Sequence, residues 1–107
     1  MKQTMKLLNI VHELMRIVEM DIGNQIDNDS ISYHRLVTHL QFFAQRVIDG
    51  NSQGEGDSFL YEQVKKNYPE SMQTAKKLKR YIETSYHFPV ENEELIYLTI
   101  HIQRVKS

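Results

Sequence analysis

The chain has 107 residues, a formal net charge of −1 and no cysteine. This length suits one domain with one hydrophobic core, and the charge argues against a nucleic-acid-binding domain, which usually carries a clear basic excess. The absence of cysteine excludes disulfides and thiolate metal sites, and it fits the reducing cytoplasm. No apolar run approaches the roughly 20 residues that span a bilayer, so we expect no membrane insertion.

Residues 1–22 are predicted to form a first helix, because apolar residues recur at every third or fourth position. The expected core stripe is Met5, Leu8, Val11, Met15, Val18 and Ile22, with Leu7 and Leu14 near the same face. Gly23 is expected to end this helix, because glycine readily adopts the left-handed conformation after a helix end. In the polar turn 24–30 that follows, Asp29 or Ser30 can cap the next helix.

Residues 31–48, ISYHRLVTHLQFFAQRVI, are predicted to form a second helix with two distinct rows of side chains. The broad apolar stripe, expected to face the core, is Tyr33, Leu36, Val37, Leu40, Phe43, Ala44 and Val47. A second row runs beside it and consists of Arg35, His39, Phe42 and Arg46. A histidine between arginines has the composition of a contact surface or an anion site. A boundary histidine beside solvated arginines is the alternative.

Two further helices are expected after the loop 49–57, which contains three of the four glycines. Asp57 can cap a short helix over residues 58–67, in which Phe59, Leu60 and Val64 are expected to point inward. Pro69 suits the first turn of the next helix, residues 70–86. Its expected core stripe is Met72, Ala75, Leu78 and Ile82.

A last helix is predicted after the turn at His87 and Pro89, with Asn92 as its expected cap. The core stripe of this helix is expected to be Leu95, Leu98, Ile102 and Val105. A row beside that stripe holds Glu94, Tyr97, His101 and Arg104. Two helices therefore each present a histidine and an arginine on one row beside the core, which favours a role for His39 and His101.

Phosphorylation is the chemistry that best fits two such histidines. A neutral imidazole nitrogen is a good nucleophile towards an activated phosphoryl group, and arginines can bind the charged product. A metal site is not indicated, because the two histidines are far apart in sequence and no HxxxH or HExxH motif occurs. The chain also has no glycine-rich phosphate loop, and no cofactor is expected.

Three segments resemble the PTS regulation domain, most closely its second copy in transcription antiterminators of the BglG/SacY/LicT family. They are VTHLQFFAQRV (37–47), the YPES segment with the helix after it, and ELIYLTIHIQRV (94–105). The resemblance covers nearly the whole chain and implies a single regulation domain over residues 1–107. The implied fold is all-α, a compact bundle of five helices, which agrees with the helix count reached from periodicity.

The resemblance also implies a function, that of a regulatory module rather than an enzyme. In such antiterminators the phosphocarrier protein HPr generally phosphorylates histidines of the second copy, and the sugar permease generally acts through the first copy. By motif match the phosphorylated residues are His39 and His101. Thr38 stands where first copies often carry aspartate, which favours a second copy. RNA binding belongs to a separate N-terminal domain, so this chain resembles an excised module that acts by forming a homodimer.

The other members of the two rows are expected to support the phosphate or a dimer interface. These residues are Arg35, Phe42, Arg46, Tyr97 and Arg104. One alternative is a histidine phosphotransfer bundle, which relays phosphate from a single exposed histidine with a lysine nearby on the same helix. No lysine follows His39 within two turns. Another alternative is a structural dimerisation bundle with incidental histidines.

Overall fold

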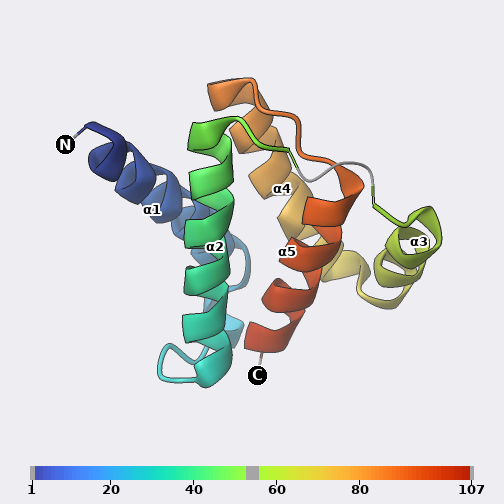
Figure 1. The fold of residues 1–107 in the computed structure, drawn as a ribbon. Helices are drawn as coiled ribbons and strands as arrows, with labels where there is room; N and C mark the ends of the chain where they lie inside the picture. Colours follow the sequence, from blue (N-terminus) through green and yellow to red (C-terminus); the bar gives the residue numbers. More distant parts are fainter. Residues whose placement is uncertain (1, 53–55, 107) are drawn as a thin grey trace.

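The computed structural model describes residues 2–52 and 56–106, and it contains five α-helices over these ranges (Figure 1). They are α1 (Lys2–Ile22), α2 (Ile31–Asp49), α3 (Ser58–Asn67), α4 (Pro69–Tyr86) and α5 (Asn92–Val105), with a short 3-10 turn, η1 (Gly23–Gln25), after α1. The only β-pairing among the described residues is one isolated bridge between Ile26 and Lys106. The expected all-α bundle of five helices is therefore confirmed.

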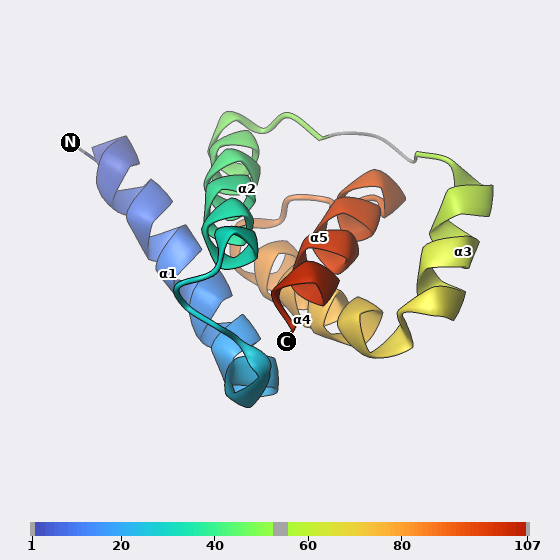
Figure 2. The ribbon, with the colours of Figure 1, turned by 90° about the horizontal axis from the view of Figure 1, so that it is seen from below.

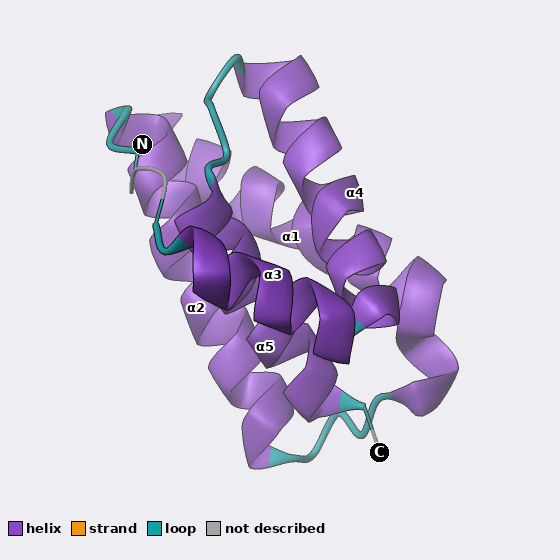
Figure 3. Cartoon of the chain, turned by 90° about the vertical axis from the view of Figure 1, so that its right-hand side faces the viewer, coloured by secondary structure: helices purple, strands orange, loops and turns teal. Residues whose placement is uncertain are grey.

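The helices α2 and α5 lie side by side and run in opposite directions, as Figures 1 and 2 both show. On its other side α2 packs against α1, which also contacts α4. The short α3 packs against α4 and α5 and lies nearest the viewer in Figure 3. The radius of gyration is 13.2 Å, close to the roughly 13 Å expected for a compact chain of about 100 residues.

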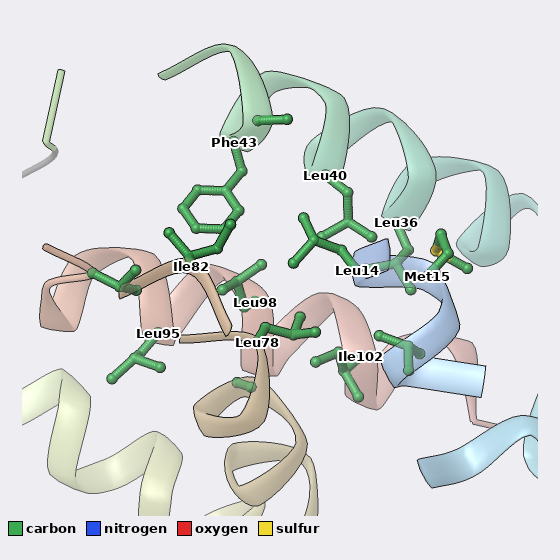
Figure 4. Packing of buried hydrophobic residues seen from close by; sticks show 14 of the residues in the cluster. Leu14, Met15, Leu36, Leu40, Phe43, Leu78, Ile82, Leu95, Leu98 and Ile102 are labelled. Atoms are coloured by element: carbon green, nitrogen blue, oxygen red, sulfur yellow. The ribbon is translucent and has the colours of Figure 1, made fainter. Parts of the chain in front are cut away.

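The core lies where α2, α4 and α5 meet α1 (Figure 4). Leu36, Leu40 and Phe43 point from α2 into this core and are fully buried. The expected stripes of α4 and α5 are buried throughout, at Met72, Ala75, Leu78, Ile82, Leu95, Leu98, Ile102 and Val105. Tyr33 and Val37 are only half-buried, at the edge of the α2 stripe.

Two helices bury less near their N-terminal ends than their periodicity predicts. Met5 and Leu8 on α1 are 59% and 54% exposed, so their assignment to the core is wrong. The N-terminal turns of α1 project away from the other helices (Figures 1 and 2), and the core face begins at Ile10, which is fully buried. Phe59 and Leu60 on α3 are also exposed, at 72% and 43%, and α3 buries Val64 alone.

Polar caps begin α2 and α3 as expected, and a left-handed glycine ends α2. The backbone N–H of Tyr33 donates to Ser30 Oγ at 3.1 Å, and the N–H of Phe59 donates to Asp57 Oδ1 at 2.9 Å. Gly50 ends α2 with φ 72°, and the N–H of Asn51 donates to the carbonyl of Arg46 at 3.0 Å. This pattern is a Schellman motif, in which glycine avoids the steric penalty of a Cβ.

The first helix ends at Ile22 as predicted, but two expected helix caps are wrong. Gly23 does not take the left-handed conformation, because the chain continues from α1 into the 3-10 turn η1. Asn92 is the first residue of α5 rather than its cap, and Glu91 holds the cap position without a side-chain hydrogen bond. Pro69 occupies the first turn of α4 as predicted.

Gly56 closes the loop before α3 directly against the start of α5. Its φ is 74°, and a Cβ at this position would lie 3.0 Å from the backbone nitrogen of Glu93. Both observations require glycine here. The centre of the expected loop 49–57, residues 53–55, lies outside the described residues. None of the described helices is long and apolar enough to span a membrane.

Candidate functional site: two side-chain pairs between α2 and α5

The histidines of the two rows meet across the contact between α2 and α5. The rings of His39 and His101 are stacked, with centroids 3.7 Å apart and planes inclined by 25°. Their helices run antiparallel, so a residue after His39 faces a residue before His101. Arg46 lies seven residues after His39, Glu94 lies seven residues before His101, and these two side chains form an ion pair. Two side-chain pairs thus connect the helices, about 10 Å apart at 1.5 Å per residue.

The two histidines differ in burial. His39 is exposed, whereas His101 is only 7% exposed. The pKa of His101 is lowered to about 4, chiefly by burial and in addition by the neighbouring His39, Arg104 and Arg35. His101 is therefore neutral at pH 7, with one ring nitrogen carrying a free electron pair.

The second pair is charged and lies deeper. Glu94 is 2% exposed, and its ion-pair partner is Arg46, whose guanidinium also lies 5.9 Å from the centre of the Phe43 ring. Burial raises the pKa of Glu94, and Arg46 opposes that shift. Arg46 Nε is buried and has no hydrogen-bond partner among the described residues.

Both pairs line one surface depression of about 290 Å³. Its lining residues are Leu36, His39, Phe42, Arg46, Glu94, Tyr97, Leu98 and His101. Phe42 and Tyr97 form its aromatic rim and are 59% and 49% exposed. The depression thus combines two imidazoles, a cation and a carboxylate under two exposed aromatic rings, which suits the binding of a small anion or a partner's side chain.

The structure brings most of the predicted site residues together. His39, Phe42, Arg46, Tyr97 and His101 share the depression. Arg35 and Arg104 do not line it, although both lie close enough to lower the pKa of His101. Both are exposed and have no carboxylate partner within residues 2–52 and 56–106.

Sequence reasoning missed Glu94 as a site residue, although it placed Glu94 on the row of His101. The missed signal is the shared spacing of seven residues in opposite directions, from His39 to Arg46 and from His101 back to Glu94. In the part of the chain that the structure describes, no group of three or more histidine or carboxylate side chains could hold a metal ion.

Comparison with known proteins identifies the family. A family model described as the PRD domain matches residues 12–105. The chain belongs to the PRD domain family. The match includes all four members of the two pairs.

Curated relatives carry the same domain within longer proteins. This PRD domain is 37% identical over 105 residues to the transcription antiterminator LicT of Bacillus subtilis, and 35% identical over 107 residues to the beta-glucoside operon antiterminator of Dickeya chrysanthemi. It is 31% identical over 104 residues to the protein GlcT of Staphylococcus haemolyticus. These alignments cover 98%, 100% and 96% of the chain but only 38%, 38% and 36% of the relatives. The resemblance to a regulation domain of the BglG/LicT family is thereby confirmed.

Proposed function

We propose that this PRD domain is a non-enzymatic regulatory module of a transcription antiterminator, controlled by phosphorylation of His39 and His101. The observation that carries the proposal is the stacked pair of histidines, 3.7 Å apart, in a depression on the surface. The names of two relatives, both antiterminators, support the regulatory role. A pair of facing histidines suits a regulator better than a phosphotransfer bundle, which needs only one.

The proposed reaction needs a phosphorylated protein donor but no cofactor. The unprotonated ring nitrogen of the acceptor histidine attacks phosphorus, and the bond between phosphorus and the donor's histidine nitrogen breaks. The electron pair of that bond returns to the donor imidazole. The low pKa of His101 keeps its ring in the nucleophilic form at neutral pH, and exposure leaves His39 directly accessible to a donor.

Cations beside the histidines support binding of the modified side chain. A phosphoryl group adds nearly two negative charges, which guanidinium groups bind by charge-assisted hydrogen bonds. Arg35 and Arg104 are free of carboxylate partners among the described residues and are therefore available. Arg46 is held by Glu94 in the unmodified domain.

The proposed partners follow from the family. HPr is the expected phosphoryl donor, and the sugar permease of the phosphotransferase system is a second candidate partner. The domain would act in the cytoplasm as a homodimer within a longer protein, whose separate N-terminal domain binds RNA. Thr38 favours assignment as a second copy.

The decisive experiment is intact mass measurement after incubation with phosphoenolpyruvate, enzyme I and HPr. We expect one added phosphoryl group for each available site and its loss in mild acid, because the bond between phosphorus and nitrogen is acid-labile. His39→Ala combined with His101→Ala should abolish labelling. His12→Ala and His34→Ala are matched controls, because both histidines are exposed on other faces. Labelling that survives the double substitution would reject the site assignment.

A second experiment tests dimerisation through the depression. Phe42 is 59% exposed at its rim, so a second copy could cover the ring. Sedimentation of wild type and Phe42→Ala, with and without phosphorylation, should show a dimer that the substitution weakens. Phe59→Ala is the matched control, because that ring is 72% exposed on α3. A wild type that stays monomeric in both states, or equal dimers in all three proteins, would reject the interface.

RNA binding tests the assignment of that activity to a separate domain. The net charge of −1 lacks the basic excess that is usual for a nucleic-acid-binding domain. We expect weak or no binding of an antiterminator hairpin at moderate salt, and sub-micromolar affinity measured by filter binding would contradict this.

A further inference from the structure

The ion pair between Arg46 and Glu94 has a feature that a purely structural pair does not need. It lies in the same depression as the two histidines. Glu94 is the one buried carboxylate among the described residues, and Arg46 is its only ion-pair partner there. The cation best placed to bind an anion inside the depression is therefore already occupied by an anion of the protein itself.

The direction of the side chains brings Arg46 and His101 towards each other. Side chains on a helix lean towards its N-terminus. On α2 this direction carries Arg46 back towards the histidine pair, and on antiparallel α5 it carries His101 towards Glu94. Because both pairs line the same depression, we expect a group added to the ring of His101 to lie on the side of Arg46.

We propose that Glu94 occupies Arg46 in the unmodified domain and releases it when His101 is phosphorylated, so that Arg46 exchanges a carboxylate for the phosphoryl group. The inference rests on the proposed function for its trigger. A phosphoryl group carries nearly two negative charges and three acceptor oxygens, whereas the carboxylate carries one charge, so the guanidinium favours the phosphoryl group. The free Nε–H of Arg46 offers a donor that Glu94 does not use.

The exchange has a consequence for Glu94, which stays buried without its cation. The other charged group that acts on it is Glu93, and this neighbour raises the pKa of Glu94 in the same direction as burial does. A buried carboxylate without a cation takes up a proton rather than keep its charge. Phosphorylation of His101 should therefore be accompanied by uptake of one proton from solvent onto Glu94.

Inorganic phosphate provides a test that does not depend on HPr. We would titrate the unmodified domain with phosphate and follow the ring resonances of His39 and His101 by NMR. Glu94→Gln keeps the shape of the side chain but frees Arg46, so it should bind phosphate on the order of five- to tenfold more tightly than wild type. Glu93→Gln removes the same charge from the neighbouring residue and should change the affinity less than about twofold.

The double substitution Glu94→Gln with Arg46→Gln should lose the gain in phosphate affinity that Glu94→Gln alone produces. The proposal is overturned if Glu94→Gln and Glu93→Gln behave alike, or if the gain persists without Arg46. The latter result would assign the phosphate to Arg35 and Arg104 instead.

A measurement on the wild type covers the case in which a variant fails to fold. The carboxyl resonance of Glu94 should titrate at higher pH in the HPr-phosphorylated domain than in the unmodified domain, and an unchanged or lower midpoint overturns the exchange. If HPr adds no phosphoryl group at all, the proposed function fails. The phosphate titration still decides whether Glu94 prevents Arg46 from binding phosphate.

Discussion

The histidine pair and the ion pair between α2 and α5 share one geometry but differ in chemistry and in depth. Each joins one side chain of α2 to one of α5, and each is offset from the other by seven residues along both helices. One member of the histidine pair is exposed, whereas the ion pair places a carboxylate at 2% exposure. The same contact between α2 and α5 therefore holds one pair with an exposed ring, that of His39, and one pair with an almost fully buried carboxylate, that of Glu94.

This difference separates the roles of the two pairs. The exposed ring of His39 costs little to change, so the histidine pair suits modification. A buried ion pair tolerates the loss of either partner poorly, because the remaining charge stays in a medium of low dielectric constant. The four predictions below test this separation, beginning with the largest expected effect.

Loss of Arg46 should destabilise the domain more than any change at the exposed arginines. Arg46→Ala leaves Glu94 buried without a cation, so we expect the free energy of unfolding to fall by about 3 kcal/mol. Arg104→Ala removes an exposed arginine that has no ion-pair partner among the described residues, and it should change the free energy of unfolding by less than about 0.5 kcal/mol. Urea unfolding at pH 7 measures both variants. Similar losses of free energy would show that the ion pair of Arg46 stabilises the domain no more than the exposed Arg104 does.

Acidification should destabilise the domain through His101. Its pKa is lowered from 6.5 to about 4 in the folded state. Between these values the unfolded chain binds a proton at this residue and the folded domain does not, so stability falls as the pH decreases. Between pH 7 and pH 4.5 the wild type should lose on the order of 2 kcal/mol more than His101→Gln does.

Urea unfolding at a series of pH values measures this difference. The raised pKa of Glu94 has the opposite sign, because it favours the folded state at low pH. Glu94 is present in both proteins, so its contribution largely cancels in the comparison. Parallel stability curves for wild type and His101→Gln would contradict the burial of a neutral His101.

The order of phosphorylation should follow the difference in exposure. His39 is accessible in the folded domain, whereas His101 must become more exposed before a donor can reach it. His101→Ala, which keeps only His39, should therefore be labelled on the order of tenfold faster than His39→Ala, equivalent to about 1.4 kcal/mol in barrier height. Time-resolved intact mass with HPr measures both rates, and faster labelling at His101 would reverse this interpretation.

The exposed arginines should have only a small effect on the histidine pair. Arg104→Gln removes a cation that lowers the pKa of His101, so this pKa should rise, by less than one unit because solvent and salt screen an exposed charge. Lys66→Gln on α3 is a control without such an influence. NMR titration of the His101 ring measures both variants. An unchanged pKa in Arg104→Gln would show that the charge of Arg104 does not act on His101.

Local periodicity predicted the helices well, but it did not predict which helix ends are buried against other helices. The stripes of α4 and α5 are buried along their lengths, because each packs against neighbours throughout. Met5 and Phe59 fit their stripes equally well, yet both are exposed. The pattern reports which side of a helix is apolar, and burial also requires a partner helix at that height.

The sequence predicted which residues belong to the site but not which of them contact each other. Two rows of side chains placed a histidine and an arginine beside the core on each of two helices. The rows do not reveal that α2 and α5 face each other in antiparallel fashion, which is a tertiary property, and so the pairing of Arg46 with Glu94 was missed. The unequal burial of His39 and His101 was equally hidden, because both lie at the edge of an apolar stripe.

Gly56 makes the ion pair sensitive to a substitution outside the depression. Its backbone has φ 74°, and a Cβ there would lie 3.0 Å from the nitrogen of Glu93, the residue immediately before Glu94. The side chain of any other amino acid would displace the first turn of α5, although no residue that lines the depression is substituted. Random mutagenesis of this domain should therefore recover destabilising changes at codon 56, which alter the start of α5 through its backbone.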